Sequence, residues 1–366
     1  MRIKKITIDN YKVLYHTEIN PGKVNVFIGK NGAGKSIILY AIGILYSAMT
    51  DGITNSALQQ KGVRLGPPDL YRSRFLTLQN ETDPISLSAE WIEDDNILKY
   101  TAILQPPTEM APKYWKYVSE LFAKNEKEIF TRPSTEQIKE NMKNNNSMKK
   151  AILEEYPNMK YFIPENNNSW NYGIYQPYFD VMRGNIVDPL FREPLGLHGG
   201  RLAEAIKSMV RVVDGQLVFG NLDPEKLFSF MPWASTIIVT RKDFARVVER
   251  VLEFTDKYLP HRVKFSSYDI SDGNLYILFL ICLMQHPEIS KIFAIENFAY
   301  GLDNDAAMLI TKMFCNMALQ RDKTVFLTTH DPFVVKALDL DNDDIRLFSV
   351  ERNEKGYAEI KRIISV

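Results

Sequence analysis

A glycine-rich segment at residues 29–36 constrains this chain more than any other feature. The segment reads G-x-x-x-x-G-K-S, follows an apolar run at 24–28, and precedes a second apolar run at 37–46. A buried strand, a glycine-rich loop and a helix in this order are the context in which such a segment binds phosphate. The glycines let the backbone wrap the anion, and successive backbone N–H groups and the helix N-terminus face it.

Two side chains of this loop predict specific contacts with a nucleotide. Lys35 would place its ammonium at the β- and γ-phosphates, and Ser36 would offer its hydroxyl to Mg²⁺. The residues expected to bind the nucleotide through the loop are Gly29, Asn31, Gly32, Ala33, Gly34, Lys35 and Ser36.

The composition sets broad limits on the kind of protein. The 366 residues suffice for one large or two modest domains. Lys plus Arg and Asp plus Glu both number 45, so there is no overall attraction to nucleic acid, although a local basic face is compatible with this balance. The two cysteines, Cys282 and Cys315, lie in apolar surroundings and fit a reducing compartment. No signal peptide or membrane-length apolar run is present, and we expect a cytoplasmic protein with no membrane partner.

The apolar patterning predicts an α/β protein with a mixed sheet and flanking helices. Strands are expected at 3–8, 24–28, 85–91, 97–104, 292–295, 325–328, 345–350 and 357–363. Helices are expected at 37–46, 202–213, 243–258 and 277–284, and the polar stretch 113–161 is expected to be helical. We divide the chain into an N-terminal lobe at 1–110, a helical or irregular insertion at 111–200, and a C-terminal lobe at 201–366.

Three further motifs follow far along the chain. Ser271 and Gly273 stand before a predicted apolar helix, and Glu296 follows the apolar run 292–295. A short segment then leads to Asp303, and His330 follows the last buried run. A carboxylate at the end of a strand can hold the Mg²⁺ shell, and a histidine in that position can reach a γ-phosphate oxygen.

These four motifs in this order resemble the ABC-type ATPases, within the branch that SMC proteins, RecF and the overcoming-lysogenization-defect ATPases share. The resemblance covers about 1–50 and 262–366, and N-Y-K at 10–12 matches the N-[FY]-K start of that branch. The stretch 195–203 is similar to a glycine-rich stretch of RecF-like members. The resemblance implies ATP and Mg²⁺ as cofactors, with Lys12 near the nucleotide. It also implies a head-to-head dimer, in which Ser271 and Gly273 of one subunit cap the γ-phosphate held by Lys35 of the other.

The chain departs from this family at the catalytic position. Asn297 stands where a glutamate usually follows the strand-end acid Glu296, and an asparagine can orient a water but cannot take its proton. We therefore expect catalysis by Glu296, Asn297, His330 and Asp303, with slow hydrolysis and a long-lived ATP-bound dimer. Alternatively, Asp303 or Asp331 serves as the base.

No obvious glutamine marks the loop that carries one in this family. Gln105, after the predicted strand 97–104, is the candidate.

The motif I-[DE]-N-…-L-[DN] and the block T-T-H-D-P at 328–332 resemble the stand-alone ATPases of anti-phage systems such as Septu, PARIS and some retrons. This resemblance implies a sensor or scaffold that controls a separate effector, such as a nuclease. The chain ends soon after His330, so we expect the effector to be a second protein.

A competing interpretation is a RecF-like DNA-repair ATPase that clamps DNA. Its basic face would come from Arg241, Lys242, Arg246 and Arg250 on a predicted helix. A third interpretation is a structural oligomer held together by ATP.

Overall fold

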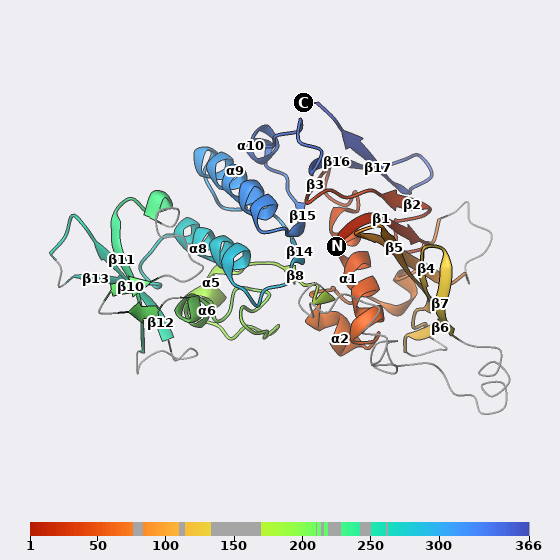
Figure 1. Ribbon diagram of the computed structural model, residues 1–366, viewed down its shortest axis with the longest axis horizontal. Coiled ribbons are helices and arrows are strands. Elements are labelled where there is room, and N and C mark those ends of the chain that lie inside the picture. Colours follow the sequence, from red (N-terminus) through yellow and green to blue (C-terminus); the bar gives the residue numbers. More distant parts are fainter. Residues whose placement is uncertain are drawn as a thin grey trace.

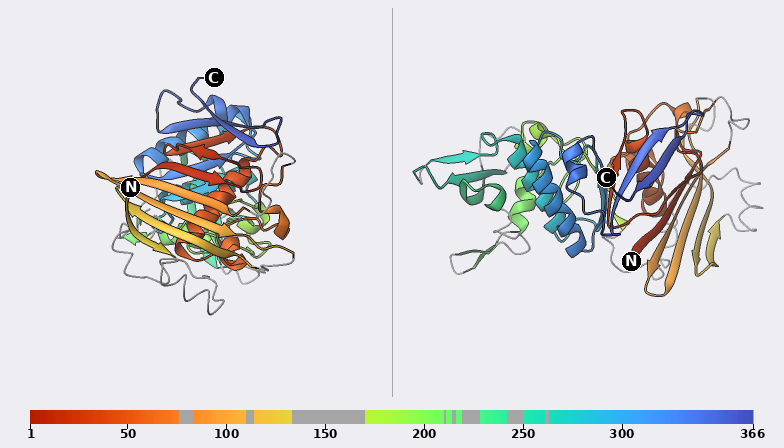
Figure 2. Two further views of the ribbon diagram at one scale, coloured as in Figure 1. Left: turned by 90° about the vertical axis from the view of Figure 1, so that its right-hand side faces the viewer. Right: turned by 90° about the horizontal axis from the view of Figure 1, so that it is seen from above.

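The chain forms an elongated molecule with two stacked sheets at one end and a small sheet at the other (Figure 1). The computed structural model describes residues 1–75, 83–109, 114–132, 170–209, 211–213, 216–218, 228–241, 250–260 and 263–365. Helices occupy the middle of the molecule and cover one face of the central sheet (Figure 2). Within the described residues, no helix is both long and apolar enough to cross a bilayer.

The central sheet has six strands and draws its neighbours from distant parts of the sequence. Its order is β17 (Ala358–Ile363), β16 (Ile345–Arg352), β3 (Val24–Ile28), β15 (Thr324–Thr328), β14 (Ile292–Ile295) and β8 (Ile174–Tyr175). Only the β16–β17 pair is antiparallel among the described pairings of this sheet. The inner strands β14 and β15 are buried along their whole length, as expected where both faces of a parallel sheet are covered. The predicted mixed sheet is confirmed.

A second sheet is built from the N-terminal third alone. It is antiparallel in the order β2 (Thr17–Ile19), β1 (Arg2–Asp9), β4 (Ile85–Glu93), β5 (Asn96–Gln105), β6 (Lys116–Lys124) and β7 (Lys127–Arg132). Helix α1 (Lys35–Thr50) packs between the two sheets (Figure 2). This position explains why nearly all of α1 is apolar, because both of its faces are buried. Short helices α2 (Asn55–Gln60) and η1 (Pro68–Leu70) follow it.

The prediction of helix from residue 113 onwards is wrong for 116–132, which form β6 and β7. Two of the charged residues in this region are buried in the core. Glu120 and Arg132 are both almost fully buried and form an ion pair, and the Tyr100 hydroxyl donates a hydrogen bond to Glu120. Because Glu120 and Arg132 are charged but buried, the sequence does not show the alternation of apolar and polar residues that predicts a strand. Residues 133–169 lie outside the described residues, and the three-part division of the chain stays a prediction.

The helix predicted at 243–258 is also wrong for 250–258. A three-stranded antiparallel sheet of β11 (Ala234–Arg241), β12 (Arg250–Asp256) and β13 (Lys264–Ser266) occupies this region, with 242–249 outside the described residues. Residues 250–256 read R-V-L-E-F-T-D, a β-branched and aromatic composition that favours a strand once α6 packs against it. Arg241 and Arg250 are cross-strand partners, so these two do not share one helix face, whereas Lys242 and Arg246 lie outside the described residues.

A helical layer packs on the central sheet and carries the second half of the expected site. It contains α5 (Phe179–Arg183), α6 (Leu202–Met209), α8 (Asp272–Gln285), α9 (Asn304–Gln320) and α10 (Pro332–Lys336). Helix α6 ends at Met209, and residues 211–213 of the predicted helix 202–213 instead form β9 (Arg211–Val213), which pairs with β10 (Gln216–Val218). Helix α8 contacts α5, α6 and α9, which fixes the segment at its N-terminus.

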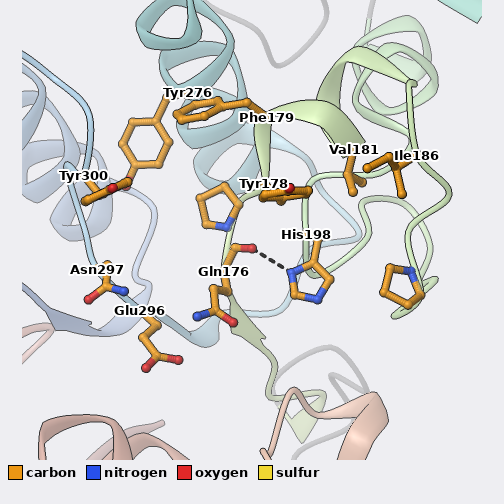
Figure 3. A pocket seen from close by; sticks show the side chains of 12 residues that line it. Gln176, Tyr178, Phe179, Val181, Ile186, His198, Tyr276, Glu296, Asn297 and Tyr300 are labelled. Atoms are coloured by element: carbon orange, nitrogen blue, oxygen red, sulfur yellow. Dashed lines mark hydrogen bonds between the residues drawn. The ribbon is translucent and has the colours of Figure 1, made fainter. Parts of the chain in front are cut away.

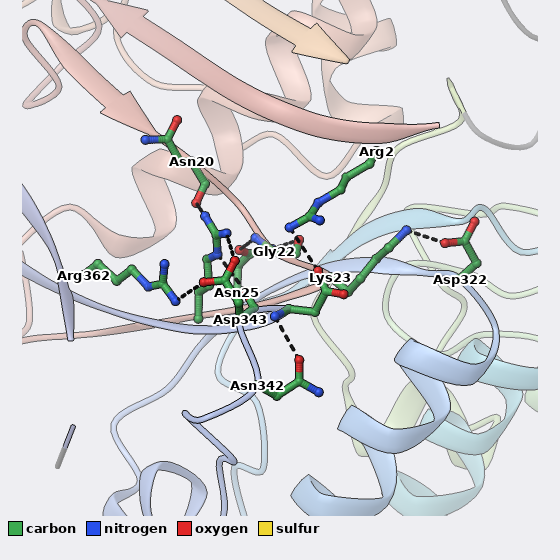
Figure 4. Close-up of polar contacts among 11 residues, drawn as sticks. Arg2, Asn20, Gly22, Lys23, Asn25, Asp322, Asn342, Asp343 and Arg362 are labelled. Atoms are coloured by element: carbon green, nitrogen blue, oxygen red, sulfur yellow. Dashed lines mark hydrogen bonds and ion pairs between the residues drawn. The ribbon is translucent and has the colours of Figure 1, made fainter. Parts of the chain in front are cut away.

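Polar contacts clamp β3 between strands that come from the other end of the chain (Figure 4). Asn25 is fully buried in β3, and its Nδ2 donates to the Val325 carbonyl at 3.1 Å. Nearby, the Asp343 carboxylate accepts from Arg346 at 2.5 Å and from Arg362 at 2.6 Å. Asp343, in the loop before β16, thereby joins this loop to both β16 and β17.

The Lys323 side chain links the end of α8 to the start of β15 through hydrogen bonds. Its side chain is 5% exposed, and its Nζ donates to the Leu283 carbonyl at 2.8 Å and lies 3.4 Å from those of Ile289 and Ser290. Burial lowers the pKa of Lys323 to about 7, because removing the ammonium from water disfavours its charged form.

Lys323 therefore predicts a pH dependence of folding stability. An unfolded lysine titrates near 10.5, so between about pH 7 and that value the unfolded chain binds more protons than the folded protein. The Lys323 contribution to the free energy of unfolding then rises with pH by up to about 1.4 kcal/mol per pH unit. We expect the stability of the wild type relative to Lys323→Met, measured by urea denaturation, to rise between about pH 7 and about pH 9. A difference that is independent of pH would contradict this assignment.

Candidate functional site

The site lies at the carboxyl edge of the central sheet. Strands β3, β15, β14 and β8 are parallel neighbours, so the residues that follow them meet at one edge. The glycine-rich loop follows β3, His330 follows β15, Glu296 and Asn297 follow β14, and Gln176 follows β8. Segments that lie up to about 300 residues apart in the sequence are thereby brought together.

The glycine-rich loop adopts the backbone of a phosphate cradle. Gly29, Gly32 and Gly34 have φ of 148°, 77° and 120°, which side chains other than hydrogen rarely allow. A Cβ on Gly34 would lie 2.8 Å from the Val13 side chain. Ala33 and Gly34 are buried, whereas Asn31 and Gly32 are exposed at the mouth of the loop. These observations fit an anion held by the loop.

The Lys35 ammonium lies inside this loop. Its Nζ donates to the Gly29 carbonyl at 2.8 Å and to the Lys30 carbonyl at 3.0 Å. Burial lowers the pKa of Lys35, because the charged form is partly withdrawn from water. The ammonium is therefore held where the loop would wrap a phosphate.

Glu296 joins the start of α1 to the end of β14. The Ser36 hydroxyl donates to its Oε1 at 2.5 Å, and the Tyr40 hydroxyl donates to its Oε2 at 3.0 Å. Glu296 is 7% exposed, and burial together with this carboxylate raises the pKa of Tyr40. Hydroxyl and carboxylate oxygens are the hard ligands that Mg²⁺ prefers, so Ser36 and Glu296 fit that cation.

Asn297 and His330 also lie at the carboxyl edge of the central sheet. The Asn297 backbone lies in the left-handed region with φ of 56°, and its N–H donates to the Thr328 hydroxyl at 3.0 Å. Both residues line one pocket beside the turn 298–302. Burial and the charge of Lys35 lower the pKa of His330, which favours a neutral imidazole beside that ammonium.

The two aspartates considered as alternative bases, Asp303 and Asp331, each cap a helix. The Asp303 carboxylate accepts from the Ala306 N–H at 2.9 Å and caps α9, and the Asp331 carboxylate accepts from the Phe333 N–H at 2.8 Å and caps α10. Capping holds each carboxylate against its own helix. This argues against either as the base.

Gln176 takes the position that we assigned to Gln105. Gln105 ends β5 and pairs with Lys116 in the antiparallel sheet, whereas Gln176 follows β8 beside Glu296. In Figure 3 the Gln176 side chain lies between Glu296 and His198. The prediction that Gln105 is the glutamine at this site is therefore wrong. The only local signal was a two-residue strand before Gln-Pro, too short to be recognised without its partner β14.

Ser271 and Gly273 begin α8 on the surface. The exposed Ser271 hydroxyl accepts from the Asn274 N–H at 3.4 Å, and a Cβ on Gly273 would lie 3.4 Å from Leu302. The start of α8 therefore adjoins the segment that leads to Asp303. Among the described hydrogen bonds and ion pairs, none joins 271–273 to the loop at 29–36.

Lys12 is held against aromatic rings of the N-terminal lobe. Its Nζ lies 5.6 Å from the ring centroids of both Tyr11 and Tyr71, and its N–H donates to the Tyr71 carbonyl at 3.0 Å. Burial and the charge of Arg64 lower the pKa of Lys12. A contact of Lys12 with nucleotide stays a prediction.

Two family models match successive parts of the chain. Residues 1–178 match "AAA ATPase domain", and residues 217–336 match "AAA domain, putative AbiEii toxin, Type IV TA system". The matches include the glycine-rich loop, Gln176, the start of α8, Glu296 and His330.

Two known proteins are similar to the chain, one in part of its sequence and one in its fold. The chain is 40% identical over 89 residues to "DNA double-strand break repair Rad50 ATPase" of Saccharolobus solfataricus, which covers 24% of this chain and 10% of that protein. The chain thus matches about a tenth of the length of this relative. The SMC head domain from Thermotoga maritima has a TM-score of 0.51 at 12% identity and covers 100% of both chains. The fold is that of an SMC head domain.

The relocation of the glutamine can be tested by paired substitutions. We expect Gln176→Ala to lower ATP turnover about 10-fold or more, because its amide faces the Glu296 carboxylate where it can orient a water. The matched control Gln105→Ala should leave turnover unchanged. Phosphate release measured at saturating ATP distinguishes the two, and equal effects would contradict the assignment of Gln176.

Proposed function

We propose that this chain, an ABC-like ATPase of the SMC/Rad50 type, binds ATP with Mg²⁺ at the carboxyl edge of its central sheet. The observation that carries this proposal is the convergence of the Lys35 ammonium in its loop with the Ser36–Glu296 contact. Residues 29–36 would hold the phosphates, while Ser36 and Glu296 would hold Mg²⁺, which would neutralise phosphate charge when bound. His330 would contact the γ-phosphate.

Hydrolysis is expected to be slow. Asn297 can hold a water through its amide but offers no basic atom, and Asp303 and Asp331 are committed to helix caps. The ATP-bound state would then persist, which suits a protein whose bound nucleotide is a signal.

Slow hydrolysis predicts a gain of activity on restoring a carboxylate. Asn297→Glu should raise steady-state phosphate release by about 100-fold, since a base placed directly after Glu296, where the unmodified chain has none, contributes about that factor or more. Asn297→Gln, which keeps the amide, is the matched control and should show no gain. Rapid turnover by the unmodified chain, well above that of Lys35→Ala, would refute the slow-hydrolysis account.

ATP is expected to join two copies of the chain. The exposed start of α8 presents Ser271 and Gly273 on the surface, free of the loop in the same chain, where they can meet the γ-phosphate held by a second copy. Leu302, which adjoins Gly273, lies on the same turn as the highly exposed Tyr300. An apolar exposed turn beside the proposed contact supports a subunit interface.

We further propose that the dimer is the sensor or scaffold of an anti-phage defence system and controls a separate effector, such as a nuclease. The second matching family, "AAA domain, putative AbiEii toxin, Type IV TA system", supports a role of this class. The alternative is a DNA-repair ATPase, which the name of the Rad50 relative supports.

Affinity purification of the tagged chain separates these two functions. We expect a stoichiometric second protein that is retained after nuclease treatment and lost or altered with Lys35→Ala. Recovery only together with DNA, with a steep dependence of binding on salt, would instead support the repair ATPase.

A further inference from the structure

A pocket of about 390 Å³ adjoins the proposed site on the side of the helical layer (Figure 3). Its walls are mostly aromatic and apolar, and include Tyr178, Phe179 and Tyr276. Glu296 and Asn297, which end the β14 segment, belong to the same lining. His198 also lines the pocket, so an imidazole shares one cavity with the two residues at the expected centre of hydrolysis.

The imidazole of His198 is fixed at one nitrogen and open at the other. Its Nδ1 lies 2.8 Å from the Gln176 carbonyl oxygen. A carbonyl only accepts, so Nδ1 carries the proton and Nε2 keeps a lone pair in the neutral ring. Among the groups that the structure describes, none forms a hydrogen bond with Nε2. The hydrogen bond to Gln176 thus assigns the tautomer and leaves a basic atom available.

The glycine-rich stretch 195–203 holds the backbone of His198 in place. The buried Asp188 carboxylate accepts from the N–H groups of Leu190, His198 and Gly200 at 2.9, 3.1 and 3.1 Å. A Cβ on Gly196 or Gly200 would lie 2.0 or 2.6 Å from Asp188, so glycine is needed for this close approach. These hydrogen bonds to a buried carboxylate therefore fix the backbone of His198.

We propose that His198 is the proton acceptor for the attacking water in ATP hydrolysis by this chain, in place of the carboxylate missing at position 297. This inference rests on the proposed ATPase function. The water oxygen forms a bond to the γ-phosphorus, and the bond from that phosphorus to the bridging oxygen breaks. The electron pair of the broken bond stays on the ADP oxygen, and the water proton passes to Nε2 of His198. Asn297 and Gln176 orient the water through their amides.

The acidic groups near His198 come from two elements. Glu296, at the end of β14, lines the same pocket, and Asp188, in the preceding loop, accepts from the His198 backbone N–H. The other titratable groups of the pocket are the hydroxyls of Tyr178, Tyr276 and Tyr300. No lysine or arginine belongs to the described lining of the pocket.

Two substitutions separate the basic atom from the structural hydrogen bond. His198→Asn keeps an N–H donor near the position of Nδ1 and removes Nε2, whereas His198→Gln keeps a polar atom near Nε2 without its basicity. We expect both variants to lower single-turnover ATP hydrolysis at saturating ATP about 10-fold or more, with ATP affinity within about twofold of the wild type. The control His16→Gln changes an exposed histidine outside the pocket and should leave the rate unchanged.

The pH profile and a rescue exclude a purely structural role. The wild-type rate should rise with pH as an imidazole loses its proton, and this rise should be absent in His198→Asn. Asn297→Glu should restore hydrolysis to His198→Asn, because the carboxylate replaces the missing base. Independently of activity, nitrogen NMR of histidine-labelled protein should show a neutral ring with the proton on Nδ1, in a signal that His198→Asn removes.

Two results would contradict the role of His198, and they differ in what they mean for the ATPase proposal. Wild-type rate and pH profile in His198→Asn would overturn the role of His198 and leave the ATPase proposal standing. Wild-type hydrolysis no faster than that of Lys35→Ala would overturn both the role of His198 and ATP hydrolysis, while a separate measurement of ATP binding would still report on the nucleotide site.

Discussion

The hydrogen bonds that Ser36 and Tyr40 donate to Glu296 join residues 260 and 256 positions apart, and the rest of the site depends on them. They hold the first two turns of α1 against the end of β14. Because α1 is buried between two sheets, it cannot turn or slide without disturbing both cores. The loop before α1 is therefore fixed in relation to every residue that follows a neighbouring strand.

Parallel pairing decides which of those residues meet. Since β3, β15, β14 and β8 run in one direction, their carboxyl ends deliver a phosphate-binding loop, a histidine, a carboxylate and an amide to one edge. The helical layer adds His198 from a loop that is anchored on Asp188. The chemistry thus comes from single residues at strand ends, and the two cores supply their rigidity.

Much of this arrangement could be predicted from local patterns. The glycine-rich loop is contiguous, and fully buried parallel strands are short apolar runs, so β3, β14 and β15 were expected where they occur. The remainder depends on contacts between distant residues. Strand β6 buries Glu120 against Arg132, which makes its sequence resemble a polar helix. Strand β8 has two residues and gains its identity only from pairing with β14, so Gln176 was missed.

His198 illustrates the same limit. Its role rests on the Gln176 carbonyl, on Asp188 and on a shared pocket, and none of these follows from the glycine-rich pattern at 195–203. That pattern was noticed as a family resemblance. Its physical reason, two glycines closed around a buried carboxylate, became visible only in the structure.

The central claim is that ATP bound at this edge joins two copies of the chain through the exposed start of α8. Sedimentation velocity with Mg²⁺ and a non-hydrolysable ATP analogue tests it most directly, using the wild type and Ser271→Arg. The account predicts a nucleotide-dependent dimer for the wild type and a monomer for Ser271→Arg that still binds the analogue. A wild type that binds the analogue and stays monomeric, or a Ser271→Arg variant that dimerises equally well, would contradict it.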